Sequence, residues 1–74
     1  MKDFYAVRGL IKASKYRTEG NFAKIMDLSS RSLSLKLNGE RAFTLPEVQL
    51  MVSLLEIPTN RIQYYFFGNT VQNN

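Results

Sequence analysis

A single arginine set among four serines is the part of this sequence best suited to contact another molecule. Residues 29–34 read SSRSLS, which places Arg31 between short hydroxyl side chains. An arginine can form two parallel hydrogen bonds to a guanine base, while serine hydroxyls contact phosphates or cap exposed amides. The chemistry that these residue types support is recognition through hydrogen bonds, and not the making or breaking of covalent bonds.

Two short helices joined by a tight turn must position this segment, and residues 22–39, FAKIMDLSSRSLSLKLNG, fit that arrangement. Ala23 is small enough for two helices to approach closely, and Asp27 stands where the chain leaves the first helix. Leu28 can fill the corner between the helices, and Ser29 is a favourable N-cap for the second one. The pattern predicts a helix-turn-helix unit.

The second helix of this unit is predicted to have a narrow apolar side and a polar side. Leu33 and Leu37 fall on one face, while Arg31 and Leu35 fall on another. Gly39 follows the helix and can adopt the left-handed conformation in which helices often end. A helix with short polar side chains and an arginine on its outer face suits the major groove of DNA.

Helical periodicity and capping residues predict an all-α protein. Asp3 and Thr18 are suited to cap the first two helices, and the segment TLPE at residues 44–47 has the pattern of a capping box. The sequence around Pro58 ends the helix that begins there. The five predicted helices cover about residues 4–14, 19–26, 30–38, 44–56 and 60–67. They form one compact domain over residues 1–67, followed by a flexible polar tail over 68–74.

Composition excludes most catalytic chemistry. The chain has no cysteine and no histidine, which removes disulfides, thiol nucleophiles, the usual general base and the common zinc ligands. Its four glycines form no phosphate-binding loop, and its six carboxylates are scattered. We therefore predict that the protein is not an enzyme and that it uses no metal, cofactor or small-molecule substrate.

Charge and hydropathy predict a soluble protein with an anionic partner. Ten basic and six acidic residues give a net charge of +4, which favours phosphate backbones or acidic protein surfaces. No apolar run approaches the ~20 residues of a membrane span. Arg8 and Lys12 interrupt the apolar residues of the N-terminus, so no signal peptide is expected. These features predict a cytoplasmic protein without a membrane partner.

The segment SRSLSLKLNGERAFTL, residues 30–45, resembles the recognition helix and following loop of the Cro and lysogeny-repressor type of phage helix-turn-helix domain. The run LNGERAFTLPEV, residues 37–48, is its most specific part, and the likeness extends from about Val7 to Phe67. The resemblance implies a five-helix fold of the lambda-repressor type. It points first to small Cro-like regulators and antirepressors, of the modulator-of-repression type, in phages of Gram-positive bacteria.

The resemblance also implies roles for individual residues. The N-terminal half of the helix over residues 30–38 would enter the major groove, with Ser30 and Arg31 leading. Candidate phosphate contacts are Lys15, Arg17, Lys24, Lys36 and Arg41. The predicted DNA-binding or partner-binding residues are Thr18, Glu19, Ser29, Ser30, Arg31, Ser32, Ser34, Leu35, Lys36, Asn38 and Arg41.

Three residues depart from the pattern of the resembled family. Glu19 stands where Gln is frequent, and an acidic group there would repel a phosphate. Asp27 stands where Gly is frequent because the turn often needs a positive φ, which Asp tolerates better than most residues. Leu35 stands where a polar base-reading residue is usual. It could contact a thymine methyl group, anchor another protein, or simply be an exposed leucine.

Two functions are consistent with these residues. The main interpretation is a phage-type regulator of the lysis–lysogeny switch in the bacterial host, which binds double-stranded operator DNA through residues 30–38 and opposes or modulates the lysogeny repressor. The alternative is an antirepressor that binds the DNA-binding domain of the phage repressor. Tyr5, Leu50, Tyr64 and Phe67 are predicted to point outward, which would suit a protein partner or a homodimer.

Overall fold

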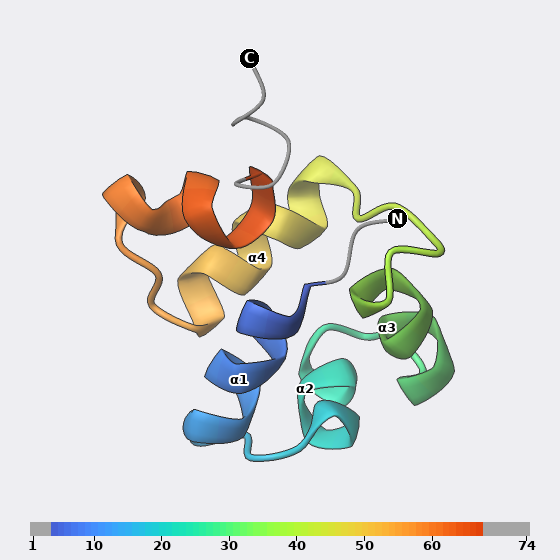
Figure 1. The fold of residues 1–74 in the computed structure, drawn as a ribbon. Helices are drawn as coiled ribbons and strands as arrows, with labels where there is room; N and C mark the ends of the chain where they lie inside the picture. The colour runs from blue at the N-terminus through green and yellow to red at the C-terminus, as the bar shows by residue number, and fades with distance from the viewer. Residues whose placement is uncertain (1–3, 68–74) are drawn as a thin grey trace.

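The structure is all-helical over the residues that it describes, as the sequence predicted. The computed structural model describes residues 4–67, which form four α-helices and two short helical turns (Figure 1). Within this range no helix has the length and hydropathy that crossing a membrane requires. The elements are α1 (Tyr5–Ala13), α2 (Glu19–Ile25), α3 (Ser30–Leu37), α4 (Leu45–Leu54), the 3-10 turn η1 (Thr59–Arg61) and the π-helical turn η2 (Gln63–Phe67).

Helix α1 occupies the centre of the arrangement. It packs against α2, α3 and η2, and α2 packs in turn against α3. Figure 1 shows α1, α2 and α3 grouped on one side of the molecule, with α4 and the C-terminal turns above them. The amide of Phe4 donates a hydrogen bond of 2.9 Å to the carbonyl of Leu37. The start of α1 is therefore tied directly to the end of α3.

Polar side chains cap three helices at the positions that the sequence predicted. Thr18 and Ser29 each accept a hydrogen bond from the amide three residues later, at 3.1 and 3.0 Å. Thr44 and Glu47 form the reciprocal capping box, in which each side chain accepts from the backbone amide of the other, at 3.2 and 2.9 Å. Each bond satisfies an amide that has no partner within its own helix.

Three helices end in the same kind of left-handed turn. The residue after the C-cap has a positive φ in each: 61° at Asp27, 84° at Gly39 and 56° at Glu56. The amide of the following residue then donates to a carbonyl five residues earlier, at 2.9 to 3.0 Å, which is the Schellman arrangement. The sequence predicted this conformation at Gly39 and favoured it at Asp27. Glutamate has no preference for it, so Glu56 gave no such signal.

Apolar side chains from α1, α2, α3, α4 and η2 meet in one core. The buried members are Val7, Ile11, Phe22, Ala23, Met26, Leu33, Leu37, Met51, Ile57 and Phe66. Helical periodicity accounts for all of these buried positions except that of Ile57. Ile57 follows the left-handed turn at Glu56, where an apolar residue commonly packs back on the helix that has just ended.

The last predicted helix is not a regular α-helix. Residues 60–67 were expected to form one, but the structure has the 3-10 turn η1 and the π-helical turn η2 in this region. So short a helix is marginal by itself, and here packing decides its shape: Phe66 is 3% exposed, while Ile62 and Tyr65 are half-buried. The predicted cap Asp3 and the predicted tail over 68–74 lie outside the described residues.

Replacing Glu56 by glycine is expected to stabilise the protein. A left-handed conformation costs a non-glycine residue about 1–2 kcal/mol, and the extra chain entropy of glycine costs about 0.5–1 kcal/mol, so Glu56→Gly should raise the free energy of unfolding by about 0.5–1 kcal/mol. Urea unfolding measures the difference. Ser53→Gly, an exposed change inside α4, is the control and should destabilise by about 0.5 kcal/mol. Destabilisation by both substitutions would show that Glu56 is not strained.

Candidate functional site

The two short helices and the tight turn predicted for residues 22–39 are present as α2, α3 and the corner between them (Figure 1). Ala23 is 1% exposed, in agreement with a close approach of the helices, and Leu28 packs on the core from the corner. A Cβ placed on Gly20 would lie 3.6 Å from Ser30 Oγ. The starts of α2 and α3 are therefore neighbours on the surface.

The N-terminal half of α3 presents polar side chains to solvent. Ser30 and Arg31 are exposed. Thr18 and Ser29 are also exposed, but their hydroxyls act as helix caps. Ser30 and Arg31 are thus the predicted recognition residues of α3 that are most accessible to a partner. The half-buried candidates on the same helix are Ser32, Ser34 and Leu35.

Leu35 is less exposed than its outward position in the helical pattern indicated. Its side chain is half-buried, although within residues 4–67 it is not among the apolar side chains that pack on the core. It is therefore not a fully exposed leucine, and it adds apolar area at the edge of the α3 surface. The other apolar residues predicted to point outward are exposed: Tyr5, Leu50, Tyr64 and Phe67.

Lys36, which the sequence predicted to contact DNA or a partner, is buried and not exposed in the structure. Lys36 is 7% exposed, and its Nζ lies 2.8 Å from Glu47 Oε1 and 3.3 Å from the carbonyl oxygen of Ala42. The ammonium also lies 5.9 Å from the centroid of the Phe43 ring. The segment between α3 and α4 folds over this side chain, so its charge joins α3 to the first turn of α4.

A chain of polar contacts links α1, α2 and the end of α3. Arg8 donates from Nη1 to Glu19 Oε2 at 2.7 Å and from Nη2 to Asn38 Oδ1. Asn38 donates in turn from Nδ2 to Glu40 Oε2 at 3.3 Å. These four residues form what we term the acidic chain, because it contains two carboxylates and a single guanidinium. Glu19 and Asn38, both predicted site residues, are thus half-buried members of one network.

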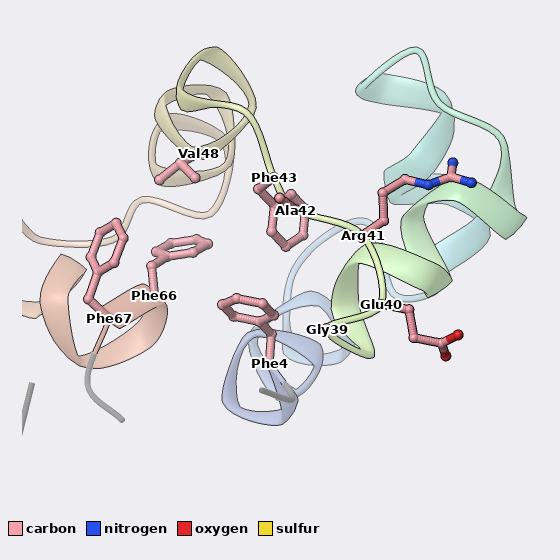
Figure 2. Close-up of a pocket in the computed structure, with 9 residues that line it drawn as sticks. All are labelled: Phe4, Gly39, Glu40, Arg41, Ala42, Phe43, Val48, Phe66 and Phe67. Carbon is pink, nitrogen blue, oxygen red and sulfur yellow. The ribbon is translucent and has the colours of Figure 1, made fainter. Parts of the chain in front are cut away.

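An apolar pocket of about 330 Å³ opens beside the end of α3. Figure 2 shows the rings of Phe4, Phe43 and Phe66 turned toward one another, whereas the side chains of Glu40 and Arg41 point away from them. The centroids of the Phe4 and Phe43 rings are 5.3 Å apart in an edge-to-face contact. The residues that line the pocket are Phe4, Gly39, Glu40, Arg41, Ala42, Phe43, Val48, Phe66 and Phe67.

The predicted site residues therefore separate into two groups along α3. Ser30 and Arg31 lie at its start beside α2, whereas Asn38 and Arg41 lie at its end beside the pocket. Sequence reasoning missed Arg8 and the pocket itself, because neither follows from local spacing. The abundance of phenylalanine and tyrosine was the one available signal for an aromatic pocket, and it did not indicate a location.

Two comparisons relate this chain to known proteins. The family model described as "Protein of unknown function (DUF739)" matches residues 1–69. Among solved structures, the chain is similar to the modulator of repression (MOR) of the temperate bacteriophage TP901-1 from Lactococcus lactis, with 38% sequence identity and a TM-score of 0.74. The match covers 88% of this chain and 86% of that one. No curated protein matches the chain significantly. Neither match is described as a helix-turn-helix or DNA-binding domain, so that part of the resemblance stays a prediction.

The ion pair between the buried Lys36 and Glu47 should make the free energy of unfolding depend on pH. Burial by itself raises the pKa of Glu47, but hydrogen bonds from Lys36 and from the Thr44 amide, with the charge of Lys36, outweigh it and hold that pKa below its ordinary value of 4.5. A carboxyl group whose pKa is lower in the folded than in the unfolded state stabilises the folded protein at pH values above the unfolded-state pKa. This contribution is lost as the pH falls through the lowered value.

Glu47→Gln tests this contribution, since glutamine can keep the capping box but carries no charge. The substitution is expected to lower the free energy of unfolding by about 1–3 kcal/mol near pH 7, because the buried Lys36 loses its counter-charge. Urea unfolding down to about pH 3 should show the difference shrinking. Glu56→Gln, at an exposed carboxylate, is the matched control. If the difference in the free energy of unfolding between the wild-type protein and Glu47→Gln stayed constant with pH, the charge of Glu47 would not be its cause.

Proposed function

We propose that this chain, which belongs to the DUF739 family, is a phage antirepressor that binds the DNA-binding domain of the lysogeny repressor. Occupation of that domain alters the access of the repressor to its operator. The protein then modulates the lysis–lysogeny switch without reading bases itself. Its activity is binding alone, and it needs no metal, cofactor or small-molecule substrate.

The observation that carries this proposal is the likeness to the MOR protein of phage TP901-1. The two chains share 38% identity over 88% of this one, so surface residues as well as core residues can be shared. The name of that protein describes modulation of repression. A protein of this size modulates repression most directly when the repressor itself is the partner.

The charges around α3 support a protein partner over a DNA backbone. Lys36 is paired with Glu47 and is withdrawn from the surface. Glu19 is the first residue of α2, where the resembled family brings a phosphate, and a carboxylate at that position repels one. Leu35 adds half-buried apolar area, which protein interfaces use at their centres.

Direct operator binding is the second candidate function, and the exposure of Arg31 favours it. Its guanidinium lies on the N-terminal half of α3, where the resembled family reads bases. If four cations neutralise phosphates, the logarithm of affinity should fall against the logarithm of salt concentration with a slope of about −3.6. The exposed candidates for those contacts are Lys15, Arg17, Lys24 and Arg41.

Titration with the DNA-binding domain of the repressor from the same phage tests the antirepressor proposal. We expect saturable binding by the wild-type protein and at least about tenfold weaker binding by Leu35→Asp, because a charge would enter the apolar part of the contact. Leu35→Ala is the milder companion variant, and thermal unfolding of both variants verifies that they fold. If both variants bound the repressor domain with wild-type affinity, Leu35 on α3 would lie outside the contact.

Titration with operator DNA alone tests the second candidate. A DNA reader should lose about 1–3 kcal/mol of base discrimination in Arg31→Ala. Arg61→Ala removes the same charge from η1 and is the matched control. For an antirepressor we expect weak, salt-sensitive binding that does not distinguish operator from unrelated DNA, with equal small losses in the two variants. Tight operator binding that is lost only in Arg31→Ala would favour the DNA reader.

A further inference from the structure

The apolar pocket and the acidic chain form one continuous surface. Phe4 lies in the wall of the pocket. Arg8, at the centre of the acidic chain, follows Phe4 by one turn on the same side of α1, and its amide donates to the Phe4 carbonyl at 3.1 Å. Glu40 belongs to both features, since it lines the pocket and accepts a hydrogen bond from Asn38. The apolar hollow therefore adjoins Glu40, and Glu19 lies beyond Arg8 in the same network of polar contacts.

The acidic chain carries a charge opposite to that of the whole protein, whereas the pocket beside it is also lined by Arg41. The chain carries a net charge of +4, whereas the acidic chain sets Glu19 and Glu40 against the single charge of Arg8. Arg41 also lines the pocket, but Figure 2 shows its side chain diverging from that of Glu40, and within the described residues no ion pair joins them. On the side of the acidic chain, from which the Arg41 side chain diverges, the local field therefore favours cations of a partner over phosphate groups.

We propose that this surface docks a cationic amphipathic helix of a partner protein, with one apolar side chain in the pocket and a lysine or arginine against Glu19 and Glu40. The proposal rests on the antirepressor function, since the DNA-binding domain of a repressor carries cations on the face that meets phosphates. A helix places an apolar residue and a cation about 5–6 Å apart, one turn along the same face. The same one-turn step separates Phe4 from Arg8.

The pocket suits a single anchor residue. A volume of about 330 Å³ accommodates one leucine, isoleucine or phenylalanine side chain with part of its backbone. Phe67 is 47% exposed at its edge, so a partner that covers this ring would remove apolar area from water. A central apolar anchor beside charged contacts is a common arrangement in helix-in-groove recognition.

Filling the pocket tests the apolar half of the proposal. Ala42 is exposed and lines the pocket, so Ala42→Trp should occupy it without removing a core contact. Ala13→Trp, at the exposed far end of α1, is the matched control. In calorimetric titrations with the DNA-binding domain of the repressor, we expect an affinity at least about tenfold lower for Ala42→Trp and unchanged for Ala13→Trp.

Reversing a charge tests the acidic half. Glu40→Lys is expected to weaken binding of the same repressor domain by about tenfold, and the loss should diminish as salt is added. Glu56→Lys makes the same change at an exposed position in the turn after α4 and should leave the affinity unchanged. An equal loss from both lysine variants would reflect net charge alone and would overturn this half of the proposal.

The outcomes separate this proposal from the function on which it rests. If the wild-type protein binds the repressor domain and both Ala42→Trp and Glu40→Lys bind equally well, the docking surface lies elsewhere and the antirepressor function stands. If the wild-type protein does not bind the repressor domain, both proposals fail. Operator binding that Ala42→Trp abolishes would place nucleic acid at the pocket and overturn the docking proposal.

A measurement on the wild-type protein covers the case in which Ala42→Trp does not fold. Addition of the repressor domain should shift the amide resonances of residues 39–43 and the methyl resonances of Val48, because these groups surround the pocket. Shifts confined to residues 30–35 would place the contact at the start of α3 and would overturn the proposal.

Discussion

Helix length is the constraint on which the rest of this structure depends. The longest of the four α-helices, α4, has ten residues, and helices this short do not persist by themselves in water. Each helix must therefore be stabilised by its neighbours and by partners for its terminal amides and carbonyls. Side-chain caps at the starts of helices and left-handed turns at their ends supply those partners within a few residues. The helix faces then remain available for the core.

Charged side chains reinforce this arrangement of short helices. The pair of Lys36 and Glu47 joins α3 to α4, and Arg8 joins α1 to Glu19 on α2 and to Asn38 at the end of α3. Such partly buried pairs lose hydration as they gain attraction, so their net contribution to stability is smaller than their short distances suggest. The cations committed in this way, Arg8 and Lys36, are not available to the phosphates of a nucleic acid. The net charge of the chain therefore overstates the cations that face outward near α3.

The remaining groups give the two ends of α3 different chemistry. Its start exposes Ser30 and Arg31, whereas its end adjoins the aromatic pocket and the carboxylate of Glu40. The eight residues of α3 span about 12 Å, so one helix of a partner protein is long enough to contact both ends. The antirepressor function and the proposed docking of a cationic helix are compatible with a single bound partner.

The sequence by itself determined where α2, α3 and α4 begin, where α3 ends, and that Leu33 and Leu37 of α3 face the core. The caps Thr18, Ser29 and Thr44, the left-handed turn at Gly39 and the exposure of Arg31 were all predictable, because each depends on a few neighbouring residues. The irregular shape of η1 and η2 was not predictable, because it depends on how Phe66 reaches the core.

Only the tertiary structure decided which groups a partner can reach. Lys36 has the spacing of a surface residue, yet the segment leading to Glu47 covers it. The pocket requires Phe4 and Phe66, from opposite ends of the described chain, to meet with ring centroids 6.1 Å apart. The burial of a charge and the opening of a cavity arise from contacts between residues distant in sequence, and no local pattern encodes such contacts.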